Sequence, residues 1–170
     1  MPQTLLGLLG ILLASFLSLH QLRSSMDADV KTREAEVQAL LADVALSRLG
    51  ELEALPFDEA VKEAYAASVV ELTPVVGAGF FRIGGDAAND DLDDAHGTST
   101  TTTHTLRDGQ ASFRAVAAVT VGYVSEADGT TPSAVPTRFK RATVTVTSPD
   151  VGAPSVSLSQ LYSCGSYCTW

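Results

Sequence analysis

The first 22 residues of the chain contain no charged side chain, and a helical pattern continues from them without a break to about Leu55. Between Leu5 and Leu19 such a helix is apolar around its whole circumference, and one face becomes polar from Arg23 onward. At 1.5 Å per residue, the uncharged part would be about 33 Å long and the whole helix about 80 Å. The uncharged part is therefore long enough to cross the hydrocarbon core of a bilayer.

The second half of this helix is predicted to be amphipathic. Its apolar residues recur at spacings of three, four and their sums, which places them on one broad stripe facing a core: Val30, Val37, Leu41, Val44, Leu52 and Leu55. Pro56 ends the helix, because the residue before a proline avoids helical dihedral angles. We therefore expect residues 1–55 to form one helix, with residues 1–22 in a membrane or in the core of a filament.

Residues 56–170 are predicted to form a globular α+β head. Residues 57–67 indicate a second, shorter helix with two acidic residues in its first turn, where they favour the helix dipole, and residues 80–83 indicate a short strand. Residues 84–109 are rich in Gly, Asp, Asn and Thr and have no period, so we expect a loop there. Residues 110–163 alternate apolar and polar side chains, as in Ala142, Val144 and Val146, which predicts an antiparallel meander. The expected fold is α+β, with a small antiparallel sheet packed on the amphipathic half of the long helix.

The composition agrees with one domain attached to a helix. A chain of 170 residues has room for the helix and one domain of about 100 to 120 residues. With 45% hydrophobic and 18% charged residues, the chain is of the folded class and not the disordered class. The formal charge is −9 and no basic run occurs, so we expect no nucleic-acid partner.

Both cysteines, Cys164 and Cys168, lie in the last seven residues. An extended strand would separate their Cα atoms by about 13 Å, beyond the limit of about 7 Å for a disulfide. A disulfide therefore requires a turn, and Gly165 makes one easy. We expect the bridge in an exported domain, with a stabilisation of only about 2 kcal/mol for so small a loop. A zinc site is a weak alternative, because two cysteines without a nearby histidine do not complete a zinc ligand set.

Three segments that follow the apolar helix carry a family resemblance. Residues 49–59 end a helix on Leu-Pro-Phe-Asp, residues 89–97 have the pattern Asp-Asp-x-Asp-Asp-x-x-Gly, and residues 140–149 form a Thr- and Val-rich strand. In this order they resemble the type IV pilin-like proteins, in particular the minor pilins and pseudopilins of pilus and type II secretion systems. The resemblance implies a subunit whose apolar helix packs against copies of itself in a helical filament.

The amino terminus departs from that pattern. Pilins usually carry a glutamate at the fifth position of the mature chain, and Leu5 stands there if Met1 is the mature terminus. The usual pairing of that glutamate with the amino group of a neighbour is then not available. A secretory signal peptide fits poorly, because no Lys or Arg precedes the apolar run and no clear small-x-small cleavage site follows it. A simple transmembrane anchor remains an alternative.

Acidic side chains suggest one binding site in the predicted loop. Five aspartates supply oxygen ligands of the type that Ca²⁺ prefers: Asp86, Asp90, Asp91, Asp93 and Asp94. Their spacing does not match the EF-hand pattern. A solvated loop, or turns in which aspartates accept hydrogen bonds from the backbone, is the alternative. Calcium is the only cofactor that we consider.

A run of hydroxyl side chains follows the aspartates. Six residues are candidates for O-glycosylation if they face outward: Thr98, Ser99, Thr100, Thr101, Thr102 and Thr103. A flexible polar loop or an edge strand is the alternative. His20 is expected to make hydrogen bonds at the membrane edge or between helices, and His96 and His104 flank the run. No spacing pairs a nucleophile with a base, so we expect no enzyme.

These patterns together predict a structural subunit that polymerises into a pilus-like filament outside the cell. Ten side chains are expected to form the polymer core: Leu5, Leu6, Leu8, Leu9, Ile11, Leu12, Leu13, Phe16, Leu17 and Leu19. The expected partners are copies of the chain, the inner membrane before assembly, and the pilus or secretion assembly machinery. Two alternatives remain: a minor pseudopilin of such a system, and a monomeric membrane-anchored periplasmic binding domain.

Overall fold

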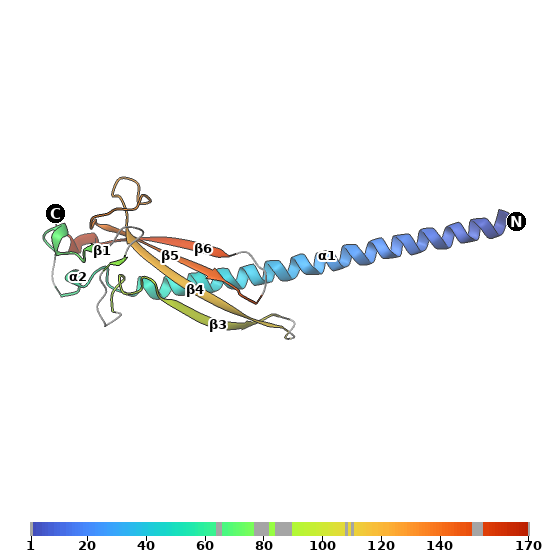
Figure 1. Ribbon diagram of the computed structural model, residues 1–170, viewed down its shortest axis with the longest axis horizontal. Coiled ribbons are helices and arrows are strands. Elements are labelled where there is room, and N and C mark those ends of the chain that lie inside the picture. Colours follow the sequence, from blue (N-terminus) through green and yellow to red (C-terminus); the bar gives the residue numbers. More distant parts are fainter. Residues whose placement is uncertain are drawn as a thin grey trace. The chain divides into compact units, whose positions relative to one another are not determined.

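A computed structural model describes residues 2–63, 66–76, 82–83, 90–107, 109, 111–150 and 155–169 (Figure 1). Side chains are described from residue 7 onward, except those of residues 62–63, 75–76 and 82–83. The elements are, in chain order, α1 (Pro2–Glu53), α2 (Ala60–Glu63), a 3₁₀ turn (Val69–Glu71), β1 (Val75–Val76), β2 (Arg82–Ile83), β3 (Ser99–Thr105), β4 (Ser112–Tyr123), β5 (Phe139–Thr147), β6 (Val156–Ser163) and a second 3₁₀ turn (Gly165–Tyr167).

The chain divides into two compact units, Met1–Val37 and Gln38–Trp170. The second unit begins inside α1, so the C-terminal part of this helix belongs to the same unit as the strands. The sequence predicts a helix to Leu55, and α1 ends two residues earlier, at Glu53. Pro56 follows three residues after that end, in agreement with its expected effect on the helix.

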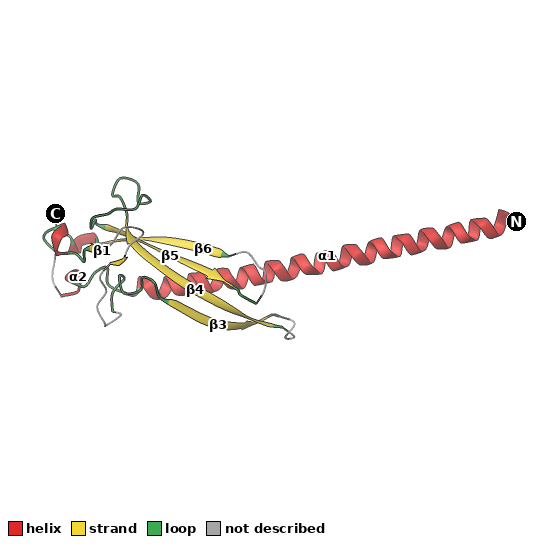
Figure 2. Cartoon of the chain, in the orientation of Figure 1, coloured by secondary structure: helices red, strands yellow, loops and turns green. Residues whose placement is uncertain are grey.

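The main sheet has four strands in the order β3-β4-β5-β6, and every neighbouring pair is antiparallel (Figure 2). Neighbours in the sheet are neighbours in the sequence, which confirms the predicted meander. Tyr123 of β4 lies opposite Lys140 of β5, and Lys140 lies opposite Tyr162 of β6. The C-terminal part of α1 packs on this sheet, so the α+β arrangement is confirmed.

One face of the sheet and one stripe of α1 form the core of the second unit. The stripe consists of Leu41, Ala45, Leu49 and Leu52, all buried. Alternate residues of β4 and β5 are buried on the sheet side: Phe113, Ala115, Ala117, Val119, Val121, Tyr123, Lys140, Ala142, Val144 and Val146. The predicted stripe is wrong at Val30, which belongs to the first unit and is exposed.

Two local predictions are wrong in part. Residues 84–109 are not one loop, because residues 99–105 form β3 and pair with β4. Of the short helix predicted over residues 57–67, the described residues form only α2, and Ala66 instead pairs with Cys168 in a parallel bridge. Of the predicted strand at residues 80–83, β2 is present and pairs with β1, and the first two residues lie outside the described part.

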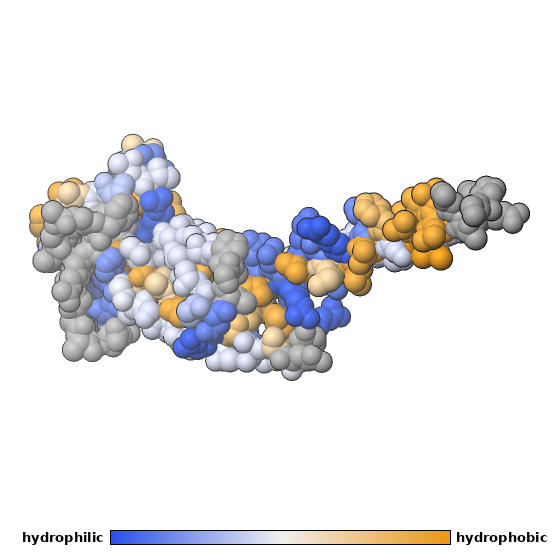
Figure 3. All heavy atoms as spheres, turned by 45° about the vertical axis from the view of Figure 1, so that its right-hand side comes forward, coloured by the Kyte–Doolittle hydropathy of each residue, from blue (hydrophilic) through white to orange (hydrophobic). Residues whose placement is uncertain are grey.

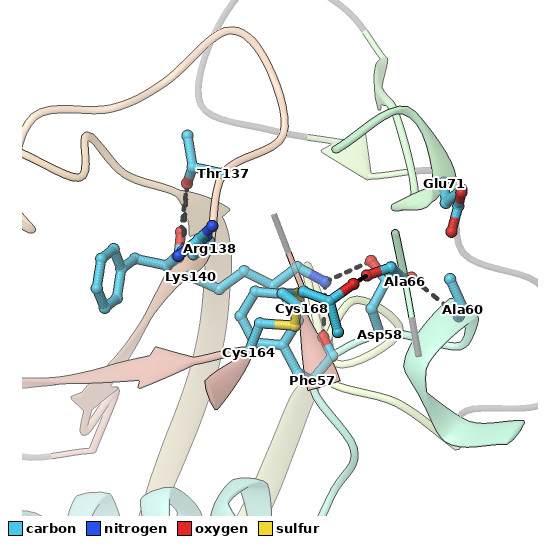
Figure 4. Close-up of a disulfide and its surroundings, with 12 residues drawn as sticks. Phe57, Asp58, Ala60, Ala66, Glu71, Thr137, Arg138, Lys140, Cys164 and Cys168 are labelled. Carbon is cyan, nitrogen blue, oxygen red and sulfur yellow. Dashed lines mark hydrogen bonds and ion pairs between the residues drawn. A yellow bond between two sulfur atoms is a disulfide. The ribbon is translucent and has the colours of Figure 1, made fainter. Parts of the chain in front are cut away.

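The disulfide between Cys164 and Cys168 is present, with 5.7 Å between the two Cα atoms (Figure 4). Gly165 opens the turn between them at φ +58°, a backbone conformation that glycine adopts without strain. The bridge lies in a small buried cluster of Phe57, Val61, Ala66, Leu72 and Tyr123. It therefore fixes the end of the chain onto the residues that follow α1.

Candidate functional site

Eight of the ten residues predicted to form a polymer core lie on a part of α1 that no described residue of this chain covers. Every residue from 7 to 35 is exposed. The large apolar side chains among them range from 53% exposed at Leu9 to 70% at Phe16, and Figure 3 shows their apolar surface in orange along the helix. Eight of them are predicted polymer-core residues: Leu8, Leu9, Ile11, Leu12, Leu13, Phe16, Leu17 and Leu19. The side chains of Leu5 and Leu6 lie outside the described part.

Within the described residues, no helix combines the length and the apolar character needed to cross a membrane.

A second group with unusual chemistry is buried in the head. Lys140 lies on the core face of β5, in phase with Ala142 and Val144, and its side chain is fully buried. Its Nζ atom donates to the Phe57 carbonyl at 2.6 Å and to Asp58 Oδ2 at 2.9 Å (Figure 4). The same atom lies 2.5 Å from Asp93 Oδ1. One ammonium group thus contacts two buried carboxylates.

Two aromatic rings also lie close to the ammonium group of Lys140. Lys140 Nζ lies 4.4 Å from the ring centroid of Phe57 and 4.9 Å from that of Tyr123. A cation so close to the faces of aromatic rings is attracted by their quadrupoles. The lysine, its carboxylates and the rings make a cluster without access to solvent, which we call the Lys140 cluster (Phe57, Asp58, Asp93, Tyr123 and Lys140).

Asp58 has hydrogen bonds on both carboxylate oxygens. Oδ2 accepts from the Tyr123 hydroxyl at 3.0 Å and from the Thr73 N–H at 3.1 Å, in addition to Lys140. Oδ1 accepts from the Ala60 N–H and from the Thr73 hydroxyl. Burial raises the pKa of Asp58, but the charge of Lys140 and these hydrogen bonds outweigh it and lower the pKa below its usual value. Asp58 is therefore ionised.

Asp93 has the opposite environment. Its side chain is 1% exposed, and its Oδ1 contacts only Lys140 Nζ among the described residues. Oδ2 has no hydrogen-bond partner among the described residues. Burial raises the pKa of Asp93 to about 7, although the charge of Lys140 acts in the other direction. The two carboxyl groups that contact Lys140 thus differ in protonation: Asp58 is ionised, and Asp93 holds its proton up to neutral pH.

The remaining predicted calcium ligands form turns. Asp91 Oδ1 accepts from the backbone N–H groups of Asp93 and Asp94, and Asp94 Oδ2 accepts from that of Asp90. These bonds are the turn network named as the alternative to calcium. Asp86 lies outside the described residues.

Three carboxylates of this region are close enough to share a cation. One oxygen from each of Asp58, Asp91 and Asp93 lies within 4.8 Å of the others. The ammonium of Lys140 already contacts Asp58 and Asp93, so the chain supplies a cation of its own at this place. Calcium stays a prediction.

The other predicted residues are distributed over the head and α1. Ser99 to Thr103 are exposed on β3, an edge strand, whereas Thr98 is half-buried and donates to the Ala95 carbonyl at 2.7 Å. The edge-strand alternative is therefore correct, and O-glycosylation stays a prediction. His20 is exposed on α1, the His96 ring contacts the backbone of Val121, and the His104 ring lies against that of Phe113.

Sequence reasoning missed Lys140 and Asp58 as site residues. One signal was available for Lys140, because the alternation of β5 places residue 140 in the buried phase with three apolar side chains. A lysine in that phase needs buried carboxylates nearby. Nothing in the sequence says which of the twenty acidic residues they are.

Comparisons of the chain with protein-family models, with curated proteins and with solved structures give no significant match.

Proposed function

We propose that the chain is a structural subunit of a pilin-like filament, in which the apolar half of α1 packs against the same segment of neighbouring copies. The observation that supports this most is the surface of α1 over residues 7–35. Between residues 8 and 19, eight large apolar side chains are more than half exposed, and no described residue of the same chain covers them. An exposed apolar surface of this kind marks an interaction site.

The free energy available from covering this surface is large. Burying one Leu, Ile or Phe side chain contributes about 1.5–3 kcal/mol, so eight of them contribute on the order of 10 to 20 kcal/mol. Association costs about 4–15 kcal/mol in lost freedom of motion. Packing on several neighbours at once therefore holds a polymer together without covalent links.

A copy of the same helix is a suitable partner for this surface. Residues 1–22 carry no charge, so two such helices lie side by side without repulsion. Gly7 and Gly10 leave open space where a Cβ would lie, and small residues let helix backbones approach closely. In this proposal the segment is held in the inner membrane before assembly, and the filament replaces lipid contacts by helix contacts.

A charged substitution on the helix tests the proposal. Leu12→Lys is expected to abolish filaments, because a charge in the packed core has no partner and costs several kcal/mol per subunit. Val135→Lys is the matched control, since Val135 lies in the head and is 62% exposed against 64% for Leu12. Filaments are counted by electron microscopy of cells that express equal amounts of each variant. Normal filaments from Leu12→Lys would contradict the proposal.

A further inference from the structure

We propose that the Lys140 cluster forms an intramolecular amide bond between Lys140 Nζ and Asp93 Cγ, with Asp58 as the group that moves the protons. This inference is independent of the proposed function, because it concerns only the head. Three observations carry it: the short distance between Lys140 and Asp93, the exclusion of solvent, and the unequal environments of the two aspartates.

The two reacting groups are already in contact. Nζ lies 2.5 Å from Asp93 Oδ1, and both side chains are at most 1% exposed. Holding an amine against a carboxyl group in this way removes the entropy cost of bringing them together, which is worth many orders of magnitude in rate. Asp93 Oδ2 has no hydrogen-bond partner among the described residues, so it is free to leave as water.

The environments of the two aspartates assign their roles. Asp58 accepts four hydrogen bonds besides that of Lys140, and these favour its ionised form. It lies 2.9 Å from Lys140 Nζ, which is the distance of a proton transfer through a hydrogen bond. Asp93 is buried with one oxygen unpartnered, and this favours its neutral acid. A carboxylate held by four hydrogen bonds next to the amine is suited to act as a base, and a buried carboxyl group whose Oδ2 has no hydrogen-bond partner among the described residues is suited to act as an electrophile.

The bond-forming step balances as follows. The ammonium of Lys140 gives one proton to the Asp58 carboxylate, and the neutral amine attacks Cγ of the protonated Asp93 carboxyl. A C–N bond forms, a C–O bond breaks, and Asp58 passes protons from the nitrogen to the departing oxygen. The products are the amide, one water molecule and Asp58 as the neutral acid. No oxidation or reduction takes place, and no co-reactant is needed.

The amide would connect two segments that are far apart in the sequence. Asp93 lies in the turn that follows the undescribed residues 84–89, and this turn is fixed by the hydrogen bond from Leu92 N–H to the Pro56 carbonyl at 3.0 Å. Lys140 lies in β5, between β4 and β6. The bond would therefore fix the segment after α1 to the middle of the sheet.

Peptide mapping of the wild-type chain tests the proposal directly. The chain is purified from cells, its disulfide is reduced, and it is digested and examined by tandem mass spectrometry. We expect one branched peptide in which Asp93 and Lys140 are joined and whose mass is lower than that of the two separate peptides by one water molecule. A wild-type chain that yields only the two separate peptides would overturn the proposal and leave an ion pair.

Three variants assign the roles of the residues. Lys140→Arg keeps the charge but lacks the amine, and Asp58→Asn keeps both reacting groups but lacks the base, so neither is expected to yield the branched peptide. Asp91→Asn is the matched control, since Asp91 is buried next to Asp93 and an asparagine oxygen can still accept the backbone hydrogen bonds of Asp93 and Asp94. Circular dichroism identifies variants that fail to fold. A full yield of branched peptide in a folded Asp58→Asn variant would contradict the role of Asp58.

Discussion

Lys140 occupies a position that the alternation of β5 otherwise gives to Ala142, Val144 and Val146. Moving an ammonium group out of water costs several kcal/mol even after relaxation. Here the cost is offset by Asp58, Asp93 and the Phe57 carbonyl, which all lie within 2.9 Å of Nζ. A lysine can occupy this buried position because the segment after α1 brings Asp58 to β5 and the turn that contains Asp93 reaches the same strand.

Tyr123 supports this group from β4. Its hydroxyl donates to Asp58 Oδ2 at 3.0 Å and lies 3.1 Å from the Thr73 carbonyl, and its side chain is fully buried. Tyr123→Phe leaves these acceptors without that donor, so we expect a loss of about 1–3 kcal/mol in the free energy of unfolding. Tyr162→Phe removes a 3.2 Å bond to the Leu49 carbonyl at a half-buried place, and a loss of about 0.5–1.5 kcal/mol is expected. Urea unfolding of both variants in detergent gives the two values, and equal losses would show that the Tyr123 hydroxyl has no special role.

The proposed amide bond has an expected pH dependence. The titratable groups around Lys140 are Asp58, Asp91, Asp93 and Tyr123. Reaction requires a protonated Asp93, whose pKa is raised to about 7, and an ionised Asp58, whose pKa is lowered. The rate should therefore be level in mild acid and fall about tenfold per pH unit above about pH 7.

Timed refolding measures this dependence. A chain made in unfolded form is refolded in detergent at about pH 6 and about pH 9, and the branched peptide is followed with time. A rate that increases steadily over this range would indicate that Lys140 must first lose its proton to solvent, which would contradict the role given to Asp58.

The helix α1 changes its environment along its length. Over residues 7–35 every side chain is exposed, whereas from Leu41 a stripe at intervals of three and four residues is buried on the sheet. Ala45 lies in the middle of this stripe and is fully buried. One continuous helix therefore has two different roles, packing of the head in its second part and, in our proposal, packing of the filament in its first.

Alanine substitutions at Leu41 and Leu46 test whether the C-terminal part of α1 packs on the sheet. Leu41 is fully buried and Leu46 is 60% exposed on the same helix. Leu41→Ala should lower the free energy of unfolding of the head by about 2–5 kcal/mol, because it removes buried surface and leaves a cavity. Leu46→Ala should change it by less than about 0.5 kcal/mol. Thermal unfolding followed by circular dichroism in detergent checks both values, and similar melting temperatures for the two variants would contradict the packing of α1 on the sheet.

Much of the second unit could be predicted from the sequence, because β4 and β5 are buried on one face and alternate accordingly. The strand β3 was missed for a physical reason: its residues are all Ser, Thr or His, and it has no apolar face to alternate. The strand β3 pairs with β4 through backbone hydrogen bonds, and these bonds do not require an alternation of apolar and polar side chains. Asp58 was assigned to a helix start because a local pattern cannot show that β5 brings a lysine to it.

The chain as a whole joins a folded head to a helix whose residues 7–35 are exposed among the described residues. The head carries a meander, a disulfide that fixes its carboxyl end, and a buried cluster that fixes the segment after α1. All of these features are internal to the second unit. Among the described residues, none packs on the apolar side chains of residues 7–19, so the proposed function depends on what covers them.

Cysteine crosslinking along α1 tests this dependence most directly. Single cysteines are placed in turn at Leu8, Leu12, Phe16 and Leu19, and at Val70 of the head as a control, since Val70 is the most exposed large apolar residue described. Assembled material is treated with a short thiol crosslinker and separated by size under denaturing conditions. We predict covalent dimers from at least one helix position and none from Val70. Only monomers from every helix position, in material where each cysteine is shown to react, would contradict packing of this helix against its copies.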